Sequence, residues 1–373
     1  MKRWTAEQAN RWYQAQPWLV GCNFIPSTAI NQLEMWQPET YDPDTIDREL
    51  GWAEQIGFNT VRVFLHDLVW SQDSREFSSR IDDFLAIASR HGMKVLFALF
   101  DDCHRPDPVP GPQPLPVPGV HNSGWKMSPG QKLVLQFHDG TVAAQEKTRL
   151  REYVTGVLAR FADDERILLW DLYNEPANSG NDDKSLELLT ATWQWAREVR
   201  LMQPLTSGLW AEACGKQVHA LCAAESDVIT FHNYSDAQKL ENVILQLRER
   251  FCGWPIICTE YMSRGSGSTF QNCLPLFKKY GVGCYNWGLV MGKTQTHFDW
   301  TTVAKLPELQ AQGMVLRPGD PIPEPTLWFH EIFRPDGTPY DPAETAFIRK
   351  ITPGRTAQPE CVGSVGKRGN LRG

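Results

Sequence analysis

Short apolar runs alternate with longer amphipathic segments along most of the chain. Each run is four to seven residues long and consists mainly of aliphatic, aromatic and Cys residues. Near-continuous apolar runs of this length are typical of strands buried on both faces of a parallel sheet. We interpret eight runs as strands: Trp18–Asn23, Thr60–Leu65, Lys94–Phe100, Ile167–Tyr173, Leu205–Leu209, Val228–Phe231, Pro255–Thr259 and Val282–Asn286.

Between these runs, apolar residues recur at helical spacing. Gly57 and Gly92 each stand between such a segment and the next strand, where Gly commonly ends a helix in the left-handed conformation. Eight strands alternating with helices predict an α/β fold, a closed (β/α)₈ barrel of the TIM type. No G-x-G-x-x-G follows any strand, which argues against a dinucleotide-binding sheet. The predicted helices are Asp44–Ile56, Ser78–His91, Ala144–Phe161, Lys184–Met202, Asp236–Phe251, Phe270–Tyr280 and, more weakly, Ala213–Ala223.

Two connections are longer than a barrel requires. After the third strand, Pro occupies every second position from 106 to 118, which makes the 105–118 segment a stiff, extended loop. The second insertion, 288–325, follows the eighth strand. Because both leave the carboxyl end of a strand, we expect them to border the active site. The alternative for the Pro-rich segment is an inert linker. We predict one catalytic domain over residues 1–353 and a disordered tail over 354–373, which has few apolar residues.

Composition excludes several classes of protein. The net charge of −7 and the absence of a basic stripe argue against nucleic acid as a partner. No run of about 18 uncharged apolar residues occurs, so we expect no membrane span. The first ten residues lack an apolar segment, and the nine Cys are scattered without a paired pattern. We therefore expect a reduced, cytoplasmic protein; the sequence does not determine its oligomeric state.

Two Glu residues stand where predicted strands end. Glu175 follows the fourth strand and precedes Pro176, and Glu260 follows the seventh strand. The ends of these strands face each other across a barrel mouth. Retaining glycoside hydrolysis needs two such carboxyl groups, about 5–5.5 Å apart, one to protonate the leaving oxygen and one to attack the anomeric carbon.

With these residues in place, the chain resembles glycoside hydrolase family 5, the cellulase and mannanase family of retaining (β/α)₈ hydrolases. The resemblance runs from about residue 20 to 287 and rests on small motifs in the family's order. It implies a β-linked oligosaccharide or glycoside as substrate, no cofactor and no metal. The matching positions are Arg62, His104, Asn174, Glu175, His232, Tyr234, Glu260 and Trp287.

The resemblance implies that Glu260 is the nucleophile and Glu175 the acid/base. Arg62 and Tyr234 would favour the ionised form of Glu260, and the charge of Glu260 would raise the pKa of Glu175. We expect Asn174 to bond the sugar 2-hydroxyl, and His104 and His232 to form polar walls. Trp287 offers a face for a sugar ring. Four further Trp in loops extend this platform, namely Trp70, Trp125, Trp210 and Trp300, whereas Trp170 and Trp195 read as core.

Three other readings remain open. A relative of different specificity would be a β-galactosidase, β-xylosidase or exo-β-mannanase. A non-catalytic carbohydrate-binding barrel would be expected to lack one of the two Glu. A metalloenzyme barrel would take its ligands from Asp101, Asp102, His104 and His232.

Overall fold

The computed structural model describes residues 1–302 and 317–352. Its centre is an eight-stranded parallel sheet whose strands coincide with the eight predicted runs to within a few residues. Seven of the strands begin and end within two residues of their predicted bounds. The fifth is much shorter than expected. The strands are β1 Val20–Asn23, β2 Thr60–Phe64, β3 Lys94–Asp101, β4 Ile167–Asn174, β5 Leu205–Thr206, β6 Ile229–His232, β7 Ile256–Tyr261 and β8 Gly283–Trp287.

The strand order is β5-β4-β3-β2-β1-β8-β7-β6, so β1 pairs with both β2 and β8. The remaining gap, between β5 and β6, is bridged beyond the end of β5. There Leu209 forms a parallel bridge with Phe231, and its N–H donates to the carbonyl of Thr230 at 2.8 Å. The sheet therefore closes, and the predicted (β/α)₈ barrel is confirmed.

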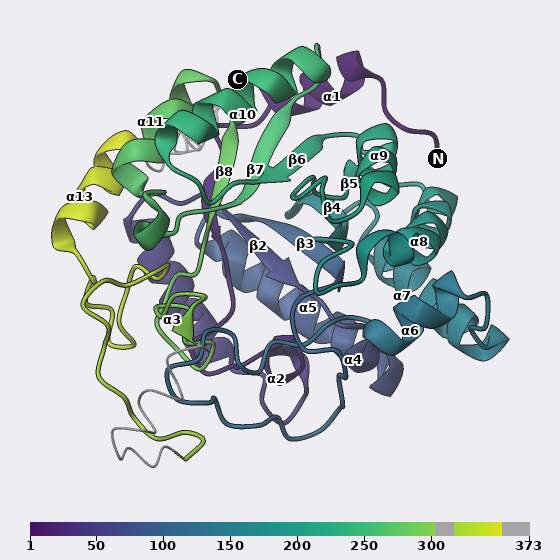
Figure 1. Cartoon of the computed structure of the whole chain (residues 1–373), viewed down its shortest axis with the longest axis horizontal. Coiled ribbons are helices and arrows are strands. Elements are labelled where there is room, and N and C mark those ends of the chain that lie inside the picture. Colours follow the sequence, from purple (N-terminus) through teal and green to yellow (C-terminus); the bar gives the residue numbers. More distant parts are fainter. Residues whose placement is uncertain (303–316, 353–373) are drawn as a thin grey trace, which may run out of the picture.

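Helices surround the barrel on the outside (Figure 1). All seven predicted helical segments are helical, although the weakest one begins three residues later than expected. The helices are α1 Ala6–Gln14, α2 Gln32–Trp36, α3 Pro43–Gln55, α4 Asp67–Gln72, α5 Ser74–Arg90, α6 Gln131–His138, α7 Ala144–Arg160, α8 Leu186–Glu198, α9 Lys216–Glu225, α10 Ala237–Arg250, α11 Phe270–Lys279 and α13 Pro342–Ile351, with short 3₁₀ turns η1 Asp182–Ser185 and η2 Arg264–Ser266.

Local sequence explains where the helices begin and end. Asp42 accepts a hydrogen bond from the N–H of Thr45 and so caps α3, and Pro43 takes the first helical position. Gly57 and Gly92 end α3 and α5 with φ of 84° and 69°, a conformation that residues with a Cβ adopt at a cost. Both glycines thus serve as the predicted helix terminators.

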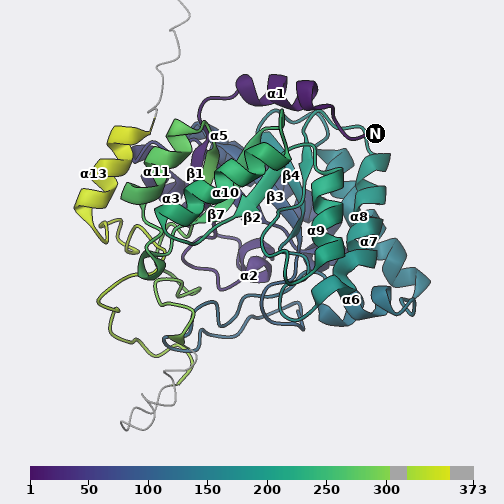
Figure 2. The ribbon, with the colours of Figure 1, turned by 45° about the horizontal axis from the view of Figure 1, so that its top comes forward.

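The two ends of the barrel differ. Helix α1 covers the amino-terminal end, where Trp12 and Tyr13 pack against a layer of buried residues that includes Leu19 and Leu96. The long connections after β3 and β8 extend from the opposite, carboxyl-terminal end (Figure 2). Trp170 and Trp195 are buried in the core, as predicted. The barrel thus leaves the carboxyl-terminal mouth as the place for a site.

Within the described residues, no helix has the length and apolar character that crossing a membrane would take. The predicted disordered tail, 354–373, and residues 303–316 of the second insertion lie outside the described residues.

Candidate active site

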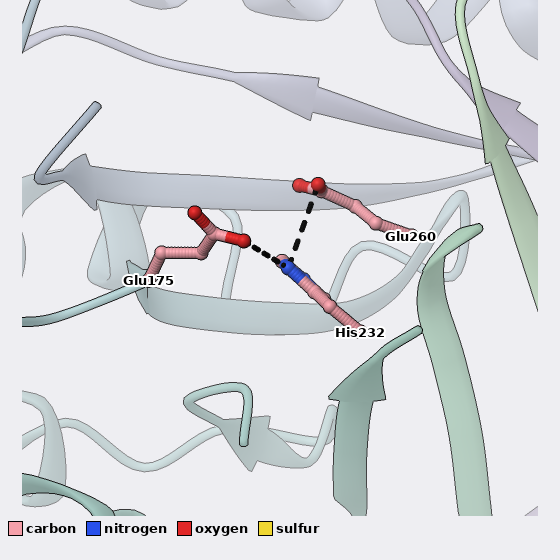
Figure 3. A group of neighbouring side chains, drawn as sticks. All are labelled: Glu175, His232 and Glu260. Carbon is pink, nitrogen blue, oxygen red and sulfur yellow. Dashed lines mark hydrogen bonds and ion pairs between the residues drawn. The ribbon is translucent and has the colours of Figure 1, made fainter. Parts of the chain in front are cut away.

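Glu175 and Glu260 lie on opposite sides of the barrel mouth and approach each other. Glu175 directly follows β4, and Glu260 is the penultimate residue of β7. One carboxylate oxygen of each, together with a ring nitrogen of His232, lie within 4.8 Å of one another. Figure 3 shows the imidazole of His232 between the two acids, 2.7 Å from Glu175 and 3.5 Å from Glu260.

Glu260 is almost fully buried and is held by two donors. Arg62 donates from Nη1 to its Oε1 at 2.8 Å, and the Tyr234 hydroxyl donates to Oε2 at 2.7 Å. Burial raises the pKa of Glu260 and the nearby charge of Glu175 raises it further, against the opposing effects of His232, Arg62 and Tyr234. The two predicted partners are present, but their effect does not outweigh burial.

Glu175 has the opposite shift. Burial acts against its charge, but the hydrogen bond and positive charge of His232, with hydrogen bonds from Cys103 and Asn178, lower its pKa to about 2. Cys103 Sγ lies 3.2 Å from Oε2, and the Asn178 amide donates to the same oxygen. The prediction that Glu260 raises the pKa of Glu175 was therefore wrong for the resting site. The prediction considered the negative charge of Glu260 but did not consider the imidazole of His232, which lies between the two acids.

Arg62 connects the two sides of the site from beneath. Its side chain is fully buried, and its guanidinium also donates to Asp171 Oδ2 at 2.7 Å, Asn174 Oδ1 at 2.6 Å and Asn23 Oδ1 at 2.8 Å. Burial opposes its charge, but Asp171 and Glu260 raise its pKa above the usual value. A planar guanidinium with five donors fits such a ring of acceptors, which an ammonium group would not.

Replacing Arg62 should therefore cost stability as well as activity. We expect Arg62→Met to lower the free energy of unfolding by about 3–5 kcal/mol, because Asp171 and Glu260 are left buried without their counter-charge. Urea unfolding at neutral pH measures this. Arg151→Ala, which removes an exposed ion pair with Glu198, is the control and should change little. A loss for Arg62→Met as small as the control's would contradict the role of Arg62 as a buried counter-charge.

The acids at the end of β3 have structural partners. Asp101 accepts from Asn174 Nδ2 at 2.9 Å and from Trp125 Nε1 at 2.7 Å, and burial raises its pKa to about 7. Asp102 accepts from the backbone N–H of Ala177 at 2.8 Å and so supports the turn that carries Glu175. That turn needs support because Glu175 and Ala177 have φ of 42° and 82°, in the left-handed region.

Within the described residues, the fold does not bring the four proposed metal ligands together. In residues 1–302 and 317–352, one group of three potential ligands comes close together, and it is the pair of acids with the imidazole between them. The guanidinium of Arg62, 2.8 Å from Glu260, places a positive charge beside any cation bound there. Of the four residues proposed as metal ligands, only His232 belongs to this group. Asp101, Asp102 and His104 lie outside it.

Comparison with known sequences identifies the family. The sequence profile described as Cellulase (glycosyl hydrolase family 5) matches residues 26–291. The chain belongs to glycosyl hydrolase family 5. It is a glycoside hydrolase, and the predicted family and enzyme class are confirmed. No curated protein sequence matches it.

Solved structures similar to this family 5 hydrolase share its fold at low identity. A GH5_18 enzyme from Streptomyces cattleya, in complex with Manβ1-4GlcNAc, is 12% identical with a TM-score of 0.58 and covers 91% of this chain and 82% of its own. An exo-β-1,4-mannosidase from Opitutaceae bacterium strain TAV5 is 17% identical with a TM-score of 0.57; the match covers 90% of this chain and 59% of that one. An endo-β-1,4-mannanase from Thermotoga petrophila is 13% identical with a TM-score of 0.54, over 91% of this chain and 77% of that one.

A cavity of about 600 Å³ opens above the two acids. Six of the eight residues that the resemblance pointed to line this cavity, and Arg62 and His232 contact residues that line it. Its walls come from the ends of several strands and from both insertions. The lining residues are Cys103, His104, Arg105, His121, Asn122, Trp125, Asn174, Glu175, Asn178, Ser179, Trp210, Tyr234, Glu260, Trp287, Trp300 and His330.

Aromatic rings form much of the cavity wall on the Glu260 side. Trp287 contacts Trp125 at a ring-centroid distance of 5.5 Å, and Trp300 packs edge-on against Tyr234 at 5.1 Å. Trp210 lies on the Glu175 side, where its Nε1 donates to the carbonyl of Pro176 at 3.1 Å. Trp125, Trp210 and Trp300 thus border the cavity with Trp287, as expected.

Trp70 does not join them, and this prediction was wrong. It lies on α4, and its ring packs against Tyr153 of α7 at 6.3 Å and beside Gly156, where a Cβ would come within 2.4 Å of the ring. Here residues 67–72 form α4 and carry the side chain outward.

The 105–118 segment was expected to form a wall of the cleft, and of its residues only Arg105, before the first proline, lines the cavity. His121 and Asn122, which follow the segment, line it as well. Within the stretch, the backbone of Gly111 is bonded by the side chain of Gln37, beside α2. None of the prolines from 106 to 118 lines the cavity, so the cleft is bordered by the residues on either side of them.

Sequence reasoning missed several residues around the acids. Asp171 interrupts an otherwise apolar run, and a lone acidic residue in a buried strand is a signal for a buried partner. Asn178, Cys103 and His330 carry no such signal, because each lies in an irregular segment whose path the sequence does not specify.

Proposed function

We propose that this enzyme is a retaining β-glycosidase that hydrolyses β-linked oligosaccharides or glycosides, with Glu260 as nucleophile and Glu175 as acid/base. The observation that carries the proposal is the separation of the two carboxylates, with one oxygen of each within 4.8 Å. Inverting enzymes keep their carboxyl groups about 6.5–9.5 Å apart to leave room for a water molecule, so the shorter separation supports retention.

In the first step, a Glu260 oxygen attacks the anomeric carbon and the bond to the leaving oxygen breaks. Glu175 gives its proton to that oxygen, and a glycosyl ester of Glu260 remains. In the second step, Glu175 takes a proton from water, whose oxygen attacks the same carbon and releases Glu260. Asn174, held by Arg62 and Asp101, lines the cavity next to Glu175 and is suited to bond the sugar 2-hydroxyl.

The first step needs the proton on Glu175, whereas the resting site favours the ionised form of that residue. We propose that bound substrate moves the proton to it. A glycosidic oxygen accepts but does not donate hydrogen bonds, so it favours the protonated form of the acid facing it. Because the two acids and His232 lie so close, their titrations are coupled and belong to the group as a whole.

Mannose-configured substrates are the second candidate within this function. Structures that share this fold include an enzyme bound to Manβ1-4GlcNAc and an exo-β-1,4-mannosidase. Hydrolysis of a panel of nitrophenyl β-glycosides, covering β-mannoside, β-glucoside, β-galactoside and β-xyloside, tests the proposal. Release of the sugar with its β configuration, followed by NMR, supports it; an α product, or no hydrolysis of any member, would refute it.

We further propose that the enzyme acts on short substrates from their ends. Trp300 of the second insertion and His121, which follows the Pro-rich segment, border the cavity on the Glu260 side. The ring centroid of His121 lies 6.4 Å from that of Trp300 and 5.3 Å from that of His330. Such a wall limits the number of sugar units that fit beyond the cleaved bond. The expected cytoplasmic location, where polymers are scarce, stays a prediction.

If the enzyme acts on substrate ends, it should release single sugars or small units from oligosaccharides. Its activity should fall as the oligosaccharide becomes longer. Trp300→Ala should reduce this preference, because it removes a half-exposed ring from the wall. Time-resolved product analysis on oligosaccharides of increasing length measures both. Leu245→Ala, an exposed apolar residue on α10, is the control. Mid-chain products and a rapid fall in polymer viscosity with the unaltered enzyme would indicate an open groove instead.

A further inference from the structure

The thiol of Cys103 lies against the acid/base. Cys103 follows Asp101 and Asp102 at the end of β3, is 5% exposed and lines the catalytic cavity. Its Sγ is 3.2 Å from Glu175 Oε2, and Asn178 Nδ2 donates to the same sulfur at 3.0 Å. Asn174 Nδ2 also donates to this sulfur, at 3.8 Å, so the sulfur accepts from two amides and has its own hydrogen available for Glu175.

We propose that Cys103 is a positioning residue for Glu175, whose thiol donates to the ionised carboxylate and accepts from the protonated carboxyl group. This inference rests on the proposed function, because it assigns to Glu175 a proton that comes and goes during each turnover. Cys103 itself exchanges no proton with the substrate and forms no bond to it.

The argument begins with what the other partners of Glu175 can do. The Asn178 amide nitrogen is a donor only and therefore favours the ionised form at all times. The imidazole of His232, when it donates from Nδ1, does the same. A thiol is both a weak donor and a weak acceptor. Of the three side chains around Glu175, it is the one that can serve both protonation states without strongly favouring either.

The state of the thiol agrees with this role. Burial raises the pKa of Cys103 well above the usual thiol value, and the nearby charges of Glu175 and Asp101 raise it further. The sulfur therefore keeps its hydrogen at neutral pH. A thiolate in this place would repel the carboxylate, whereas the neutral thiol offers it a hydrogen bond.

The test is the pKa of Glu175 itself, measured by ¹³C NMR of the labelled Glu carboxyl carbons, with Glu175→Gln to assign the signal. Loss of one weak donor in Cys103→Ala should raise the pKa of Glu175 by ~0.5–1 unit. Cys103→Ser keeps a hydroxyl that donates and accepts, and should leave the pKa at or below that of the unaltered enzyme. Cys273→Ala is the matched control, since it removes a buried thiol on α11 whose sulfur contacts Ser268.

Equal shifts in Cys103→Ala and Cys273→Ala, no shift in Cys103→Ala, or the same rise in Cys103→Ser would each overturn the inference. The kinetic counterpart is the limb of kcat/KM against pH that titrates with Glu175, which should move upward by the same amount in Cys103→Ala alone. An unaltered enzyme that hydrolyses no glycoside would refute the proposed function, while the NMR titration would still decide whether the thiol acts on Glu175.

Discussion

Glu260→Ala should abolish hydrolysis of every substrate, with a loss of at least ~10⁴-fold in kcat/KM, the scale found when a nucleophile is removed. No ester can form without its carboxylate, and a good leaving group does not compensate. Initial rates on nitrophenyl glycosides and on unactivated oligosaccharides measure the loss.

A small anion distinguishes a missing nucleophile from a damaged fold. In Glu260→Ala, azide can enter the space left by the carboxylate and attack from the same face, so a β-glycoside should give an α-glycosyl azide. Glu49→Gln, which alters a buried carboxyl on α3 that bonds Ser27 and does not line the cavity, is the control and should keep activity. Substantial hydrolysis by Glu260→Ala without added anion would show that another residue attacks.

Glu175→Ala should have an effect that depends on the leaving group. For unactivated oligosaccharides we expect a loss of ~10²–10⁴-fold, because the leaving oxygen must depart without a proton. For aryl glycosides with acidic phenols the first step needs little protonation, so their kcat/KM should fall far less.

Here azide should yield a β-glycosyl azide, since the space that Glu175 leaves is on the face where water normally attacks. Comparing kcat/KM across phenols of graded acidity gives the dependence directly, and it should be steep in the variant and shallow in the unaltered enzyme. Equal losses for activated and unactivated substrates would contradict the role of Glu175 as the acid.

The barrel could be predicted because its strands are buried on both faces, which leaves near-continuous apolar runs that differ from the helices between them. Glu175 and Glu260 could be predicted for the same reason, since a carboxylate directly after such a run has to stand at the mouth. Helices α1, α2, α4, α6 and α13 were not predicted. The three shortest of them, α2, α4 and α6, have five to eight residues each and carry too few turns for a helical period to stand out.

The electrostatics of the site could not be predicted from the same residues. Strand register brings His232 beside Glu260 in the sheet, and a shift in register at this point turns its ring toward Glu175. The sequence shows that His232 is present, but it does not show that its ring lies between the two acids. Likewise, the position of Trp70 depends on a helix of six residues that redirects the chain.

Backbone hydrogen bonds join the two ends of the first insertion, and we call this paired segment its neck. Asp101 and Ser128 exchange both backbone hydrogen bonds, at 2.8 and 3.0 Å, and Arg105 bonds the backbone of Trp125 and Met127. The catalytic neighbours Cys103 and Trp125 lie on this neck, whereas the prolines lie beyond it. Because closing a longer or shorter loop changes its entropy only slowly with length, the outer part is free to vary while the neck is kept. Natural selection could thus remodel the rim of this enzyme, and with it the choice of substrate, by insertion and deletion without disturbing the two carboxylates.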